Sequence, residues 1–218
     1  MTEKPLRLAR RFFLTRMGTG MTILGAAATT GVASAMPQTG DRTNWQPERH
    51  TQDDWFDQIP GKHRLVFDTT APDGLSSALT YATNYYSANN SSYGLQNADL
   101  AVVVIARHFS TPFAYHDAIW MKYGVQISDF IAKGKEPSTR NANARQLTTL
   151  TGRGMHLAVC QLATTAISGS IARAVNADQK DIFNEIAANL LPNAHLVPAG
   201  IVAVNRAQER GYTLVHGG

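Results

Sequence analysis

The chain has very little cysteine: Cys160 is the only one among 218 residues. A single cysteine excludes an intramolecular disulfide, and it excludes the C-x-x-C pair that a thioredoxin-like disulfide exchanger needs. Three roles remain open for Cys160. The first is a buried apolar residue of the core, the second a partner in an intermolecular disulfide, and the third a reactive thiol.

Outside its first 35 residues, the chain lacks an excess of either charge. Residues 1–35 hold five Lys or Arg and one Glu, whereas residues 36–218 hold fifteen basic and fifteen acidic side chains. The formal net charge of +4 therefore belongs to the N-terminal segment. Proteins that bind nucleic acid carry a basic footprint, so the balanced remainder predicts no nucleic-acid partner.

An apolar run long enough to cross a bilayer, roughly 20 residues, is also lacking. The apolar run at 21–35 is shorter than that and is diluted by Thr, Gly and Ser. It follows Arg10 and Arg11 and ends in a small-x-small sequence at 33–35. This combination is typical of a cleaved twin-arginine export signal. We expect a periplasmic protein without stable membrane insertion; the alternative is a retained N-terminal anchor.

Motifs that would hold a metal or a cofactor are lacking as well. The sequence Thr-Gly-Arg-Gly at 151–154 is neither a dinucleotide fingerprint nor a P-loop, and it reads as a helix stop before a strand. His108 and His116 lie eight residues apart without an H-E-x-x-H pattern, and no G-x-S-x-G is present. We therefore expect no metal and no cofactor.

What the sequence does contain is an alternation of short apolar runs with helix-periodic segments, which indicates βαβ units and a parallel sheet. The expected strands are 64–69, 99–106, 155–160, 195–200 and 212–215. They predict an α/β protein, specifically a flavodoxin-like three-layer α/β/α sandwich with a mostly parallel five-stranded sheet. We expect three parts: a signal peptide at 1–35, an N-terminal arm at 36–62 and the α/β domain at 63–218.

Several local features follow from the residue pattern. Asp73 is expected to cap a helix that the polar stretch at 88–94 then breaks. Two further helices are expected at 115–123 and 127–132. The polar stretch at 133–146 is either a functional loop or a solvated connector with a helix start. In the arm, the aromatic residues expected to pin it to the domain or to a neighbouring subunit are Trp45, Trp55 and Phe56.

The chemistry of such a sheet is expected beyond the carboxyl ends of its strands. Those ends carry Thr69, then Arg107 and His108, then Cys160 and Gln161. Cys160 also comes immediately before a helix, whose N-terminal amides favour an anion such as a thiolate. Against this stands the ordinary role of a buried cysteine at a strand end, which is packing.

Two stretches resemble a known family: LTTLTGRGMHLAVCQLATTA at 147–166 and LVPAGIVAVNRAQERGYTLV at 196–215. From about Arg64 to its end, the chain is similar to the DsrE/DsrF-like sulfur-relay superfamily. Its members are flavodoxin-like α/β domains that assemble into oligomers, and in some of them a cysteine accepts sulfane sulfur as a persulfide and passes it on. Only Cys160 matches the position of that cysteine.

The resemblance implies a homo-oligomeric sulfur carrier or sulfurtransferase that works through a persulfide on Cys160, with a sulfur donor or acceptor protein as partner. Strand-end geometry adds Arg107, His108, Gln161 and Thr69 as helpers in binding. The alternative is a non-catalytic protein, either a small-ligand binder or an oligomeric scaffold, in which Cys160 is buried for structural reasons.

Overall fold

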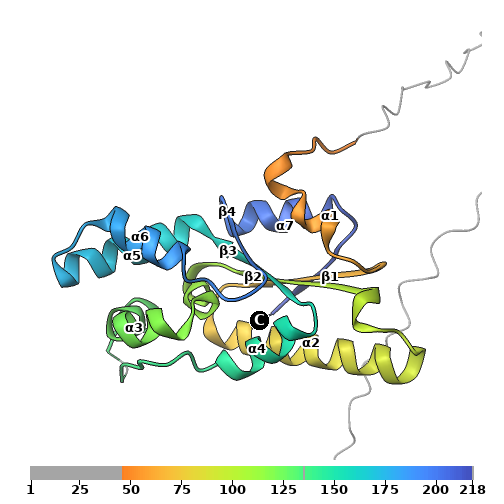
Figure 1. The fold of residues 1–218 in the computed structure, drawn as a ribbon, viewed down its shortest axis with the longest axis horizontal. Coiled ribbons are helices and arrows are strands. Elements are labelled where there is room, and N and C mark those ends of the chain that lie inside the picture. Colours follow the sequence, from red (N-terminus) through yellow and green to blue (C-terminus); the bar gives the residue numbers. More distant parts are fainter. Residues whose placement is uncertain (1–45, 135, 218) are drawn as a thin grey trace, which may run out of the picture. The chain divides into compact units, whose positions relative to one another are not determined.

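The computed structural model describes residues 46–134 and 136–217, and a fully parallel five-stranded sheet forms its centre (Figure 1). The strands are β1 (His63–Thr69), β2 (Leu100–Ala106), β3 (His156–Cys160), β4 (Ala194–Val197) and β5 (Thr213–His216). Helices pack on both faces of the sheet, so the expected three-layer α/β/α class is confirmed. The expected signal at 1–35 and Trp45 lie outside the described residues.

The order of the strands, β4-β3-β2-β1-β5, explains how the helices are shared between the faces. From β1 to β4 the chain moves along the sheet in one direction, and α7 (Gly200–Gln208) then returns it to the opposite edge at β5. Crossovers between parallel strands are right-handed, so reversing direction changes the face. The helices of the outward connections are α2 (Pro72–Tyr93), α3 (Asp117–Ile131), α4 (Ala144–Gly152), α5 (Gln161–Val175) and α6 (Gln179–Ala187). Flavodoxin itself has the strand order 2-1-3-4-5. This protein therefore shares the three-layer architecture with flavodoxin but connects its strands in a different order.

Each face has its own hydrophobic core. The larger core packs the sheet against α2 to α6, and the smaller one packs it against α7 and α1 (Trp55–Gln58). Strand β2 serves both, because alternate residues point to opposite faces: Val102 and Val104 to the larger core, Val103 and Ile105 to the smaller. This explains why β2 is a continuous apolar run with every residue buried.

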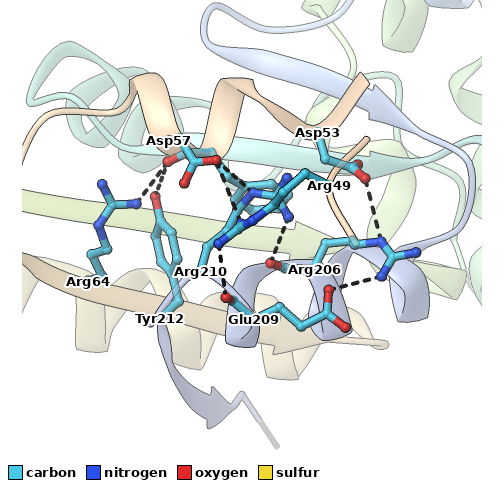
Figure 2. Close-up of polar contacts among 9 residues, drawn as sticks. Arg49, Asp53, Asp57, Arg64, Arg206, Glu209, Arg210 and Tyr212 are labelled. Atoms are coloured by element: carbon cyan, nitrogen blue, oxygen red, sulfur yellow. Dashed lines mark hydrogen bonds and ion pairs between the residues drawn. The ribbon is translucent and has the colours of Figure 1, made fainter. Parts of the chain in front are cut away.

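The described part of the N-terminal arm packs on the α7 face. Phe56 is fully buried in the smaller core, and its carbonyl oxygen accepts hydrogen bonds from Tyr212 Oη at 2.8 Å and Arg64 Nη1 at 3.1 Å. Around it, Asp57 pairs with Arg210 at 3.0 Å (Figure 2). The arm is therefore held by the buried aromatic ring of Phe56 and by the polar contacts around it.

Local expectations were corrected at the ends of α2. The N-cap of α2 is Ala71, without a side-chain cap, and Asp73 lies in the first turn. The helix continues through the polar stretch at 88–94 and ends at Gly94, whose φ of 67° is left-handed. The stretch does not break the helix: Asn89 Nδ2 donates back to Tyr85 O at 2.8 Å, and Ser91 and Ser92 are exposed to solvent.

The region between β2 and β3 was also corrected. The expected loop at 107–113 forms the 3-10 helix η3 (His108–Ala114), and the two helices expected after it are one continuous α3. Gly124 continues that helix where the backbone of Ser138 packs against it and leaves no space for a Cβ atom. The polar stretch at 133–146 ends in the start of α4. None of the helices among residues 46–134 and 136–217 combines the length and apolar character that crossing a membrane requires.

Candidate functional site

A cavity of about 850 Å³ opens at the carboxyl end of the sheet, between β3 and β4. The chain leaves β3 toward α5, on the side of the larger core, and leaves β4 toward α7, on the other side. Adjacent strands whose connections go to opposite faces form a topological switch point, where open α/β sheets bind ligands (Figure 1). The lining residues are Arg107, His108, Phe109, Phe130, Cys160, Leu162, Ala163, Ala166, Ala199, Gly200 and Ile201.

Cys160 forms part of the floor of this cavity. It ends β3 and is the N-cap of α5, where its Sγ accepts a hydrogen bond from the Ala163 amide at 3.4 Å. The residue is 7% exposed and lines the cavity. A donor amide at a helix N-terminus stabilises negative charge on the sulfur.

The backbone of Cys160 is fixed by a short chain of buried hydroxyls. Thr164 Oγ1 donates to the carbonyl oxygen of Cys160 at 3.0 Å, and Tyr115 Oη donates to Thr164 Oγ1 at 3.0 Å. Burial raises the pKa of Tyr115, which keeps its hydroxyl protonated and able to donate. These contacts hold the first turn of α5 on the end of β3.

Arg107 is the Arg, Lys, Asp or Glu among the residues that line the cavity. Its Nε and Nη2 donate to the two carboxylate oxygens of Asp68 at 2.7 and 2.8 Å, a bidentate pair across the ends of β1 and β2. The hydrogen bond with Asp68 raises the pKa of Arg107, burial opposes this, and the charges of Asp68 and a Cys160 thiolate add to the rise. The stem of Arg107 lies against Gly200, where a Cβ atom would come within 2.5 Å of Arg107 Cβ.

His108 lies at the mouth of the cavity and is exposed. Its φ is 52°, a left-handed conformation that a side chain other than glycine adopts at a cost of about 1 kcal/mol. This turn lets the chain leave β2 and enter η3, which brings Phe109 to the cavity wall. A strained residue at a ligand cavity is typical of functional sites.

The structure brings Arg107 and His108 to Cys160, but it places Gln161 and Thr69 elsewhere. Gln161 faces a separate shallow depression on the other side of α5 that it shares with Gln179 and Phe183. Thr69 is fully buried, and its hydroxyl donates to Ile105 O at 2.8 Å. Thr69 therefore fixes the strand ends beneath the site and does not line the cavity.

Most of the cavity wall is hydrocarbon, which the sequence did not reveal. Phe109 and Phe130 contribute two rings whose centroids lie 5.7 Å apart. Leu162 and Ile201, which are 67% and 59% exposed, line the same cavity. Phe109 follows a strand end by three residues and was within reach of strand-end reasoning, whereas Phe130 comes from α3 and carried no sequence signal.

The N-termini of two helices line the cavity. The first turn of α5 follows Cys160, and the first turn of α7 follows Ala199, an N-cap without any side-chain hydrogen bond. Amides at a helix start favour anions. The cavity thus joins an anion-favouring floor, with a thiol in it, to apolar walls.

Comparison with known proteins adds no assignment: neither a scan of the chain against protein-family models nor a search among curated proteins finds a match. The geometry of the residues themselves therefore carries the argument about function.

Proposed function

We propose that the protein is a sulfur carrier in which Cys160 accepts sulfane sulfur as a persulfide and passes it to an acceptor thiol. The observation that carries this proposal is the position of Cys160 Sγ, at the floor of a cavity and at the N-terminus of α5, with Arg107 lining the same cavity. A cysteine kept only for packing needs no cavity above it and no cation beside it.

The chemistry needs one thiol in the protein. The Cys160 thiolate attacks the outer sulfur of a donor R–S–SH, a new S–S bond forms on Cys160, and the old S–S bond breaks as R–S⁻ leaves with its electron pair. The resulting Cys160–S–SH is then attacked by an acceptor thiolate, which takes the outer sulfur and releases the Cys160 thiolate. No electron is gained or lost overall, and the resolving thiol belongs to the partner.

This proposal includes the family and the compartment that the sequence indicates. The resemblance of 147–166 and 196–215 to the DsrE/DsrF-like superfamily supports a sulfur relay and a homo-oligomer. The paired arginines and the small-x-small sequence at 33–35 support export by the twin-arginine route to the periplasm. A donor or acceptor protein of the relay is then a periplasmic partner.

The test is an intact-mass measurement of the protein after exposure to polysulfide. We expect a gain of about 32 Da per added sulfur, reversed by dithiothreitol and absent in Cys160→Ser. The reversal separates a persulfide from a sulfinic acid, which has nearly the same mass and is not reduced by dithiothreitol. An unchanged mass of the folded protein with polysulfide and with organic persulfides alike would overturn the proposal and favour the alternative, a ligand-binding or scaffold protein with a structural Cys160.

A second variant tests the contribution of Arg107. Arg107→Gln removes the cation from the cavity floor, and we expect sulfur uptake from polysulfide to slow by about tenfold, the effect of one charged hydrogen-bonding group. Arg173→Gln is the matched control, because Arg173 is exposed in the last turn of the same helix that Cys160 begins. Equal rates for the two variants would remove Arg107 from the mechanism.

A further inference from the structure

The residues that line the Cys160 cavity indicate which class of sulfur donor the protein accepts. This inference rests on the proposed function. An inorganic donor is a chain of a few sulfur atoms and needs little more space than the floor around Cys160. The cavity measures about 850 Å³, within the range of pockets that enclose small organic molecules. Most of this space is therefore unused by an inorganic donor.

The lining of that space is suited to a hydrocarbon body. Phe109 and Phe130 contribute two rings, and Leu162 and Ile201 line the same cavity with most of their side chains exposed. Large apolar side chains exposed around one cavity mark a surface that a ligand or partner covers. A body placed between these walls removes them from water.

The polar end of the cavity is suited to one weak negative charge and not to several. Asp68 takes two of the three guanidinium nitrogens of Arg107 and offsets its charge. The polar groups that remain around the cavity are Nη1 of Arg107, the exposed His108 ring and the amides that begin α7. A donor with several carboxylates would bring charges that the apolar walls leave without partners.

We infer that the donor is a small organic persulfide with an apolar body. Its terminal sulfur lies on Cys160, and its body contacts the apolar side chains of the cavity: Phe109, Phe130, Leu162 and Ile201. The step is the one written above, with R apolar: Cys160–S⁻ and R–S–SH give Cys160–S–SH and R–S⁻. The apolar thiol that leaves fits the same walls until the acceptor arrives.

The experiment compares three donors: benzyl persulfide, glutathione persulfide and sodium disulfide. Single-turnover rates of Cys160 persulfide formation are followed by intact mass after quenching with an alkylating reagent. Each rate is divided by the rate with the same protein unfolded in urea, which corrects for the intrinsic reactivity of each donor. We expect the normalised rate for benzyl persulfide to exceed the other two by tenfold or more, the effect of burying one ring.

Substitutions of the apolar lining residues test whether they cause the preference for benzyl persulfide. Phe130→Ala is expected to reduce the preference several-fold, and Phe183→Ala, the same change in the depression on the other side of α5, is the matched control. Leu162→Ser removes apolar surface at a position that is 67% exposed, so folding does not depend on it. It is expected to reduce the preference in the same direction.

The possible outcomes distinguish a failure of this inference from a failure of the proposed function. Preference for benzyl persulfide that falls in Phe130→Ala and Leu162→Ser but not in Phe183→Ala supports it. Equal normalised rates for the three donors, or a preference that survives both wall variants, overturn it while a persulfide on Cys160 still stands. Absence of sulfur on Cys160 with every donor overturns the proposed function, and this inference with it.

Discussion

The two ends of β3 carry His156 and Cys160 on the same face of the sheet, about 13 Å apart by the rise of a strand, yet their surroundings are opposite. At the amino end, His156 Nδ1 and His195 Nε2 lie 2.9 Å apart, and the ring of Trp55 stacks on His195 at a centroid distance of 4.0 Å. At the carboxyl end, Cys160 faces an open cavity.

The two histidines are partly buried and bond to each other, although a smaller cavity of about 420 Å³ also reaches His156. The two ring planes differ by 13° and their centroids lie 5.2 Å apart, so the nitrogens point at one another in a shared hydrogen bond. The arm covers the pair through Trp55, and its own polar residues are paired with α7 and its neighbours (Figure 2).

The two ends of β3 thus differ in the role of their polar side chains, which is structural at the amino end and functional in our proposal at the carboxyl end. At the amino end the polar groups bond to each other, whereas at the carboxyl end Cys160 and Arg107 line a cavity. If this division is right, variants at the closed end change the free energy of unfolding, and variants at the open end change sulfur uptake.

The largest expected effect comes from Phe56→Ala at the closed end. Phe56 is fully buried, so removing its ring should lower the free energy of unfolding by about 3–5 kcal/mol, measured by urea denaturation. Phe109→Ala makes the same change at the open end, where the ring is 46% exposed, and should cost about 1 kcal/mol or less. Similar losses for the two variants would contradict the division.

The same contrast explains how much of the fold the sequence predicts. The helix expected directly after Cys160 is α5 in the structure, because apolar residues recur four apart at Ala163, Ile167 and Ile171 without interruption. The polar stretch at 88–94 misled the prediction, since Asn and Ser disfavour helices unless their side chains bond back to the backbone or face water. Residue preferences do not show which of these happens.

For the site, the rule of strand ends was enough to find Cys160, Arg107 and His108. It failed for Gln161 and Thr69, because the rule says where a residue lies along the chain and not which way its side chain points. Gln161 turns around α5, away from the cavity, and Thr69 points into the structure beneath it.

The second effect in size is a dependence of stability on pH. Burial lowers the pKa of His195 to about 4, and the charge of His156 acts in the same direction, whereas in the unfolded chain the pKa is about 6.5. Between these values the unfolded state binds more protons, so the stabilisation is complete above about pH 6.5 and is lost as the pH falls toward 4. Because the ring is only partly buried, we expect a loss of about 1–2 kcal/mol.

Comparison with a variant isolates this histidine from the carboxylates that titrate in the same range. His195→Gln keeps a hydrogen-bonding side chain without the titration, so its free energy of unfolding should fall by about 1–2 kcal/mol less than that of the wild type between pH 7 and pH 4.5. His63→Gln, at an exposed position, serves as the control. Parallel pH profiles of the free energy of unfolding for the wild type and His195→Gln would contradict this prediction, because they would show that the titration of His195 does not change stability.

The smallest expected effect concerns the outer ion pair of the arm. Arg49 Nη1 lies 3.8 Å from Asp57 Oδ2, and about half of each side chain is exposed, so solvent screens the attraction. Arg49→Ala should therefore change the free energy of unfolding by about 0.5 kcal/mol or less in urea denaturation. A loss comparable to that of Phe56→Ala would mean that surface charge, and not the buried ring with its stacked neighbours, keeps the amino end of β3 closed.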